Sequence, residues 1–208
     1  MVEKAVRVAQ KVEGPVKVIW SREEDMHQDM YRPAYRNVMS ASVNADGKIT
    51  GWMHRVSGGS VLLRMFGPLK NGIDMDALDG ATEMPYDVAD QRIEYSPAEP
   101  RALRVGWWRG VGPNNTVFAI ESMMDELAKK AGKDPIAFRL AHLKQKNPRL
   151  RAALERVARE SNWDQALLAR HGRGVCAQFA FGTYMATVAE VEVMSDGTVR
   201  VRRMTSVV

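Results

Sequence analysis

Apolar and polar positions near the amino terminus predict two short helices separated by a strand. Residues 2–12 place Val and Ala at helical spacing between charges, and Gly14-Pro15 stops that pattern, so we expect the last turns of a helix that begins upstream. The apolar run 16–20 predicts a short strand. Ser21 and Glu24 then have the spacing of a capping box, which explains these charges structurally rather than catalytically.

Longer apolar stretches in the next part of the chain predict a β-hairpin followed by a long connection. Gly47 lies where a hairpin turn needs positive φ. Residues 57–86 have no clean period, so we expect a long loop of the kind that often carries function. The expected elements are, in order, a strand at 35–43, a turn at 45–47, a strand at 48–56, a helical turn near 74–78 and a strand at 91–95.

Three helices are predicted in the middle of the chain. The clearest has an apolar stripe and a glycine at its carboxyl end, Gly132, where a capping glycine belongs. Each of the other two begins with a capping residue before a proline, Asp134-Pro135 and Asn147-Pro148. The expected ranges are 115–131, 135–146 and 148–161.

The carboxyl-terminal part predicts a β-hairpin around a loop at 195–197. This register sets Val193 opposite Val199 and Val191 opposite Val201 on one apolar face. On the other face, Glu192 lies opposite Arg200 and Glu190 opposite Arg202. A one-residue slip would turn the valine face outward. The strand pattern continues to the last residue, so both ends of the sequence look arbitrary and we expect a fragment of a longer chain with an α+β fold.

Composition limits the chemistry that this chain can perform alone. Its 208 residues are 45% hydrophobic and 26% charged, as in ordinary globular proteins. A single cysteine, Cys176, rules out a disulfide framework and any iron–sulfur or cysteine-rich zinc site made by this chain alone. The four histidines lack the spacing of metal ligands. No metal site is therefore expected from these residues.

The net charge of +5 does not indicate nucleic-acid binding, because acids are interleaved with the basic residues. Arg151 and Glu155, for example, have the i, i+4 spacing of a solvated helix face. No apolar run is long enough to span a membrane and no leader pattern is present, so we expect a cytoplasmic location, with a periplasmic one left open if an upstream segment is missing.

A glycine-dense segment, residues 106–115, comes directly before the clearest helix and contains two tryptophans and Arg109. We name it the glycine loop. Glycines let backbone N–H groups approach an anion or an oxo group, and the helix that follows adds a positive dipole. A tight turn whose tryptophans fill a core explains the same residues equally well. The residues alone leave these two interpretations open.

The order of several motifs resembles one protein family. Residues 108–112 with the helices after them, including 118–122, 125–128, 132–135 and 138–139, are similar to the glycine-rich loop and following helices of molybdenum hydroxylase large subunits. Trp108 and Val111, where relatives have Phe, resemble the isoquinoline 1-oxidoreductase branch of the xanthine dehydrogenase and aldehyde oxidase family. Further similar stretches lie at 16–26, 31–33, 172–175 and 189–197.

The resemblance implies a fold, cofactors and partners. The fold would be α+β, with mixed or antiparallel strands and three helices after the loop. The cofactor would be a molybdopterin dinucleotide with molybdenum, in its cytosine form, and iron–sulfur clusters would lie only in a small 2Fe-2S partner subunit. The reaction would hydroxylate an aromatic N-heterocycle or an aldehyde with oxygen from water. Residues 1–105 would belong to a first molybdopterin-binding domain, 106–170 would form the cofactor loop and helical segment, and 171–208 would start a second domain.

By the same resemblance, Trp108, Arg109, Gly110, Val111 and Gly112 would line the cofactor, and Val111 would also form part of the substrate wall. Gly110 and Gly112 would be glycine because a Cβ would collide with the pterin or demand an unfavourable φ.

The sequence also departs from the family. The upstream glycine-rich cofactor loop and the downstream segment that carries the catalytic glutamate are absent, so no catalytic residue is assigned. The chain would need the remaining part of the large subunit to be active. The alternative is a non-catalytic remnant or scaffold module of the same fold.

Overall fold

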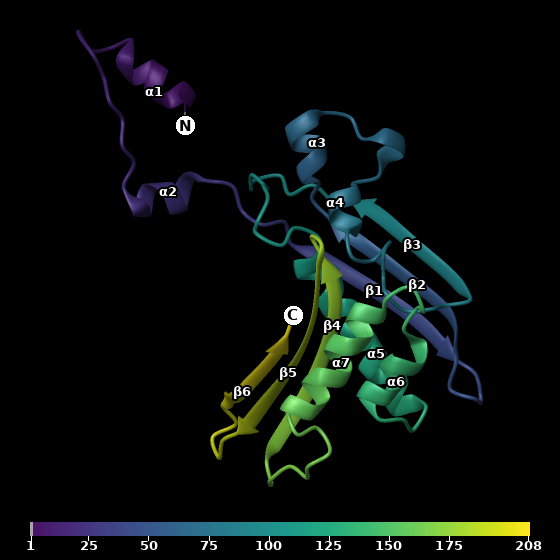
Figure 1. Cartoon of the computed structure of the whole chain (residues 1–208). Helices are drawn as coiled ribbons and strands as arrows, with labels where there is room; N and C mark the ends of the chain where they lie inside the picture. Colours follow the sequence, from purple (N-terminus) through teal and green to yellow (C-terminus); the bar gives the residue numbers. More distant parts are fainter. Residues whose placement is uncertain (1) are drawn as a thin grey trace.

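The computed structural model describes residues 2–208 and has two three-stranded sheets with helices packed between them (Figure 1). In the first sheet, β1 and β2 are antiparallel, as predicted, whereas β3 runs parallel to β2. The second sheet is antiparallel throughout. The strands are β1 (Tyr35–Val43), β2 (Ile49–Gly58), β3 (Asp90–Pro97), β4 (His171–Ala180), β5 (Thr183–Val193) and β6 (Val199–Val207). The α+β class is confirmed.

The connection from β2 to β3 contains more helix than its sequence predicts. The expected turn near 74–78 is present as α4 (Met75–Leu78), whose N-cap Asp74 accepts a hydrogen bond from Ala77 N at 3.0 Å. A second short helix, α3 (Val61–Phe66), and a 3-10 turn, η1 (Lys70–Gly72), were not predicted. Both are too short for a hydrophobic period to reveal them.

The three predicted helices of the middle segment are confirmed as α5 (Pro113–Lys130), α6 (Pro135–His142) and α7 (Pro148–Glu160). Asp134 caps α6, as predicted, by accepting bonds from the backbone of Ile136 and Ala137. Helix α6 ends four residues earlier than expected because the chain then pairs with another segment: Lys144 N donates to Pro85 O at 3.0 Å. The Asn147 side chain does not cap α7.

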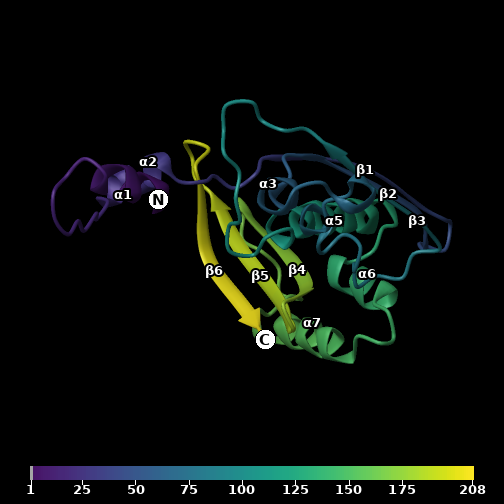
Figure 2. The same ribbon diagram turned by 90° about the horizontal axis from the view of Figure 1, so that it is seen from above.

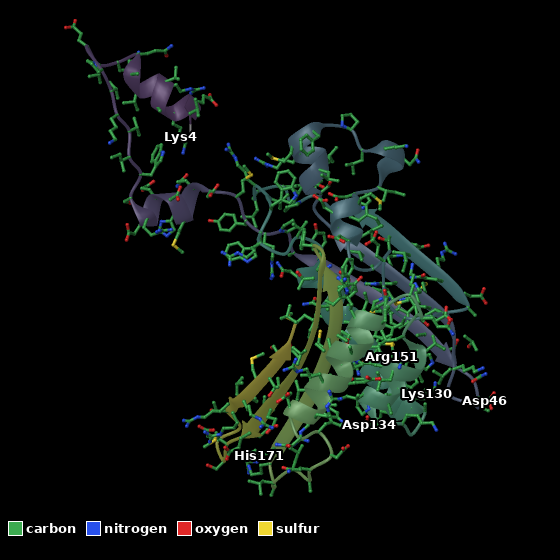
Figure 3. The ribbon with its side chains drawn as sticks, viewed as in Figure 1. Lys4, Asp46, Lys130, Asp134, Arg151 and His171 are labelled. Carbon is green, nitrogen blue, oxygen red and sulfur yellow. The ribbon has the colours of Figure 1, made fainter. Side chains whose placement is uncertain are left out.

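Helices α5, α6 and α7 form a layer that contacts both sheets (Figures 1 and 2). Helix α5 packs against β1 and β4, and α7 packs against β5. One hydrophobic cluster joins all three layers, with Trp52 from the first sheet, Met124 and Leu154 from the helices and Val188 from the second sheet. Figure 3 labels Asp134 and Arg151 on this helical layer. The Arg151 guanidinium donates to Leu140 O at 2.7 Å, which ties α7 to α6.

The amino-terminal segment extends away from this body (Figures 1 and 3, where Lys4 is labelled). It contains α1 (Val2–Ala9) and α2 (Arg22–Gln28), and neither helix has a buried residue. Ser21 caps α2 by accepting a bond from Glu24 N at 3.2 Å, as the capping-box spacing predicts. The strand predicted at 16–20 is wrong: these residues form no strand. Among the described residues, no helix is long and apolar enough to cross a membrane.

The carboxyl-terminal hairpin has the predicted register near its turn, with Val193 opposite Val199 and Glu192 opposite Arg200. The prediction that Glu190 faces Arg202 is wrong. A bulge shifts the register so that Glu190 lies opposite Arg203 and bonds to its guanidinium at 2.6 Å.

The valine face of this hairpin was expected to be buried, but the structure exposes it. Val199 is 60% exposed and Val201 is 61% exposed, because the helical layer covers the opposite face of the second sheet.

Candidate functional site

The glycine loop lies beside the segment that leads into β1. Tyr31 forms a parallel bridge with Val105, accepting a bond from Gly106 N at 2.9 Å and donating its own N–H to Arg104 O at 2.8 Å. The start of the loop is therefore tied by backbone bonds to residues far away in sequence, next to the point where β1 begins.

The loop backbone contains an unusual conformation at Val111. Its φ of 45° lies in the left-handed region, where a β-branched residue is a true outlier. Val111 N donates to Trp108 O at 2.9 Å, and the Asn114 side chain donates to Arg109 O, so the turn is held by its own bonds. Strained residues of this kind cluster at binding and catalytic sites, where the surrounding structure enforces them.

The two central glycines of the loop are required for different reasons. Gly110 has a φ of 95°, which L side chains rarely adopt, so any other residue at this position would have an unfavourable φ, as the resemblance implies. Gly112 has an ordinary helical φ of −59°. A Cβ there would collide with Asp76 O, because α4 packs directly against the loop. The Thr116 hydroxyl reinforces this packing by donating to Asp79 O at 2.6 Å.

A cavity of about 330 Å³ opens between the glycine loop, the start of β1 and the first turns of α5. We name it the loop cavity. Its wall combines aromatic rings, small backbone positions and a few polar groups. The lining residues are Arg32, Pro33, Ala34, Tyr35, Val61, Asp76, Gly106, Trp107, Trp108, Val111, Gly112, Asn114, Asn115 and Phe118.

The five residues expected to line a cofactor are distributed unevenly around this cavity. Trp108, Val111 and Gly112 line it, whereas Arg109 and Gly110 do not. The Arg109 side chain is exposed, and within residues 2–208 the only bond to Arg109 from a side chain goes to its backbone oxygen.

The aromatic residues around the cavity are unusually exposed. Trp108 is 63% exposed and Phe118, on the first turns of α5, is 76% exposed. Trp107 is anchored more firmly, because its Nε1 donates to Asp76 at 2.6 Å and its ring lies 6.0 Å from that of Phe66. The tryptophans therefore do not fill a core, which removes the main argument for reading the loop as a simple tight turn.

Burial and nearby carboxylates raise the pKa values of two groups near the cavity. The pKa of Tyr35 is raised, chiefly by burial and then by the charge of Asp74. Burial also raises the pKa of the Asp79 carboxyl, and the neighbouring carboxylates of Glu83 and Asp76 add to the effect.

A chain of three polar side chains runs from the loop cavity into the first sheet. Asn115, in the first turn of α5, accepts a bond from Asn37 Nδ2 at 2.6 Å, and Asn37 Oδ1 lies 2.7 Å from His54 Nε2. His54 is fully buried, and burial lowers its pKa to about 4. Two nitrogens of these three side chains, Asn115 Nδ2 and His54 Nδ1, are buried without a hydrogen-bond partner in the described residues.

Sequence reasoning missed this chain and much of the cavity wall. Asn37, His54 and Tyr35 come from the first hairpin, and nothing in their local pattern separates them from ordinary strand residues. Asn115 could have been identified from the sequence, since it is the last residue of the glycine loop. Within residues 2–208, no group of three or more His, Cys, Asp or Glu side chains is placed to hold a metal ion.

Comparison with known proteins agrees with the family resemblance of the sequence motifs. A family profile described as a molybdopterin cofactor-binding domain matches residues 3–143. The chain is 33% identical to isoquinoline 1-oxidoreductase subunit beta of Brevundimonas diminuta, over 96% of this chain and 26% of that protein. The chain therefore spans about a quarter of that relative.

Two solved structures have a similar fold. Aldehyde oxidoreductase from Desulfovibrio gigas superimposes with a TM-score of 0.62 at 19% identity, covering 88% of this chain and 22% of that one. Quinoline 2-oxidoreductase from Pseudomonas putida 86 also gives a TM-score of 0.62, at 16% identity, covering 88% of this chain and 28% of that one. At these identities the likeness establishes the fold.

Proposed function

The chain belongs to the molybdopterin cofactor-binding domain family, and from that premise we propose that its glycine loop binds part of a molybdenum–pterin cofactor in the catalytic subunit of a molybdenum hydroxylase. The observation that carries the proposal is the loop cavity, which borders three of the five loop residues expected at a cofactor and includes the left-handed Val111. A β-branched residue held in this conformation next to a cavity is characteristic of a ligand site rather than of a connecting turn.

The residues around the cavity fit an oxygen-rich, negatively charged ligand. Arg109, which follows the lining residue Trp108, has an exposed side chain, and Asn115 has a buried amide nitrogen without a partner in the described chain. Backbone N–H groups of residues 108–112 and the first turn of α5 would add further donors. These residues would hold the cofactor, and the Trp108 ring would cover it.

When bound, such a cofactor supplies two-electron oxidation of a carbon centre with oxygen taken from water. The role of Arg109 would be electrostatic, since a fixed cation near the reacting centre stabilises negative charge that develops there. Val111 would form part of the substrate wall, where a side chain smaller than an aromatic ring leaves more space. No residue of this chain is proposed to transfer a proton.

The proposed substrates are aromatic N-heterocycles or aldehydes, the compound classes named in isoquinoline 1-oxidoreductase, quinoline 2-oxidoreductase and aldehyde oxidoreductase. The proposed partners are the remaining part of the large subunit and a small 2Fe-2S subunit that carries electrons away. We also propose the cytosine form of the pterin dinucleotide, and a domain division with 1–105 and 106–170 preceding a second domain that starts at 171. The exposed apolar residues Val199, Val201 and Met204 on β6 support further polypeptide packing there.

The proposal is tested by two loop variants of the complete enzyme. Gly110→Val should abolish molybdenum binding, because position 110 requires positive φ and a side chain would also meet Asn114 at 2.5 Å. Arg109→Ala should retain the metal but lower turnover by about 10²-fold, the range seen when one electrostatic donor is removed. Metal analysis and turnover on each variant are the measurements.

The matched control is Gly197→Val, which places the same side chain at a φ of 85° in the hairpin turn, far from the loop and with no atom close to the added Cβ. It should keep its full metal content even if its stability falls. Normal metal content and normal turnover in both loop variants would show that the glycine loop is an ordinary turn.

A further inference from the structure

The hydrogen-bonded chain from His54 to Asn115 can run in either of two directions. His54 is neutral near pH 7, so its ring carries one N–H. If that N–H is on Nε2, it donates to Asn37 Oδ1, Asn37 Nδ2 donates to Asn115 Oδ1, and the NH₂ group of Asn115 is left over. If it is on Nδ1, every bond reverses and Asn115 is left with an oxygen instead.

The two directions differ in what they leave unpaired at His54 Nδ1, which has no partner in the described residues. The first leaves a lone pair without a donor, whereas the second leaves a buried N–H without an acceptor. Both directions leave the same number of buried N–H groups unpaired, because the N–H that is spared at His54 in the first direction is lost at Asn115. The positions of the atoms decide between them: Asn37 Oδ1 faces His54 Nε2 and Asn37 Nδ2 donates to Asn115 Oδ1, which is the first direction.

This direction determines what Asn115 offers to a ligand. Asn115 lines the loop cavity, and its Nδ2 is buried with no partner among residues 2–208. We infer that His54, acting through Asn37, holds the Asn115 amide with its NH₂ group available at the cavity wall, so that this end of the site selects a ligand group with an acceptor oxygen. His54 and Asn37 are positioning residues in this arrangement, and Asn115 is the residue that touches the ligand.

The matching ligand chemistry is a ring carbonyl or a phosphate oxygen. A pterin dinucleotide has both, so the inference rests on the proposed function and adds which side chain recognises an oxygen of that ligand. An unsatisfied buried donor is costly, and a ligand oxygen that reaches Nδ2 gains a hydrogen bond without displacing an existing one.

The direction of the chain is tested first, without any ligand. Nitrogen-15 NMR of the His54 ring distinguishes a protonated from an unprotonated ring nitrogen. The expected result is a neutral ring at pH 7 with the proton on Nε2. A proton on Nδ1 would overturn the inference, because Asn115 would then present an oxygen.

Ligand selection is tested on the full chain with two probes, inorganic phosphate and 6-hydroxymethylpterin, by following the Asn115 side-chain amide signal. A shift with phosphate alone identifies the phosphate oxygen as the group recognised, and a shift with the pterin alone identifies the ring carbonyl. No shift with either probe overturns the inference.

The Asn37→Asp variant should make Asn115 present an acceptor instead of a donor to the cavity, while the side chain at position 37 keeps its shape. A carboxylate at 37 accepts from both His54 and Asn115, so Asn115 must turn its oxygen toward the cavity. The probe that responds should bind at least about tenfold more weakly, since one hydrogen bond is replaced by a contact between two acceptors. Unchanged affinity would contradict the inference.

The matched control is Asn44→Asp in the turn of the same hairpin. Asn44 uses only its Oδ1, which accepts from Asp46 N and Lys48 N, so the aspartate keeps both bonds and should leave probe binding unchanged. The proposed function can fail on its own. That is the result if Gly110→Val of the complete enzyme keeps its molybdenum while the His54 tautomer and the probe response are as expected.

Discussion

Helix α5 carries two polar clusters that differ in how completely they are satisfied. In the middle of the helix, Glu121 is buried and accepts bonds from the Tyr86 hydroxyl at 2.8 Å and Arg139 Nε at 2.9 Å. Ala177 N, on β4, donates to the same carboxylate at 2.9 Å. At the first turn of the helix, Asn115 has a buried NH₂ group with no partner in the described residues.

The difference separates a structural cluster from a binding one. The Glu121 cluster joins α5, α6, β4 and the segment before β3, and every oxygen of its carboxylate is paired, so nothing remains to bind a ligand. The Asn115 end combines an unpaired donor, a strained Val111 and a cavity. A protein tolerates such costs where a ligand compensates for them.

The largest effect is expected at the Glu121 cluster. Arg139→Met leaves the buried Glu121 carboxylate without its cation, and removing one partner of a buried pair typically costs about 3–5 kcal/mol of unfolding free energy. Urea unfolding measures the loss. The matched control is Arg156→Met, which removes an exposed pair with Glu160 at 3.5 Å and should cost about 0–1 kcal/mol. Similar losses in the two variants would mean that the Glu121 cluster is not the structural centre.

A slightly smaller effect is expected from acid. Burial lowers the pKa of His54 from 6.5 to about 4, so the unfolded chain binds this proton more readily than the folded one. Stability from this residue is therefore present above pH 6.5 and is lost as the pH falls toward 4, by roughly 3 kcal/mol in total.

Unfolding free energies measured between pH 7 and pH 4 check this value. His54→Gln, which keeps a donor near the position of Nε2 but cannot titrate, should flatten that part of the profile. A profile that is the same in both proteins would rule out His54 as the source.

The smallest effect is expected at the strained loop residue. Val111→Gly removes the left-handed strain but makes the unfolded chain more flexible, so stability should stay the same or rise by up to about 1 kcal/mol. Val157→Ala, in the core face of α7, should instead lose about 1–3 kcal/mol. Thermal unfolding compares the two. A clear loss at Val111→Gly would place this residue with the structural positions and weaken the case for a binding loop.

The sequence predicted those parts of the fold that have strong local signals. The helices α5, α6 and α7 follow from prolines and apolar stripes, with a capping side chain only at α6, and the first hairpin follows from Gly47. Two features depend on distant packing and could not be read locally. Residues 16–20 have a strand-like pattern but no strand pairs with them, and the valine face of β6 points away from the helical layer because α7 covers the other face.

The candidate site shows the same limit. The glycine loop was identified from its composition and its resemblance to a family, and the structure brings Trp108, Val111 and Gly112 to one cavity. Asn37 and His54 were not identified, because their importance arises only when β1 and β2 place them in line with the first turn of α5.

The central claim is that the glycine loop lies against a molybdenum–pterin cofactor. Anomalous diffraction at the molybdenum absorption edge, measured on crystals of the complete enzyme, locates the metal without any assumption about the loop. The account predicts a single peak facing the loop cavity, next to Val111 and within reach of the Arg109 side chain. A peak on another face of this domain, with the loop cavity filled by protein side chains, would contradict it.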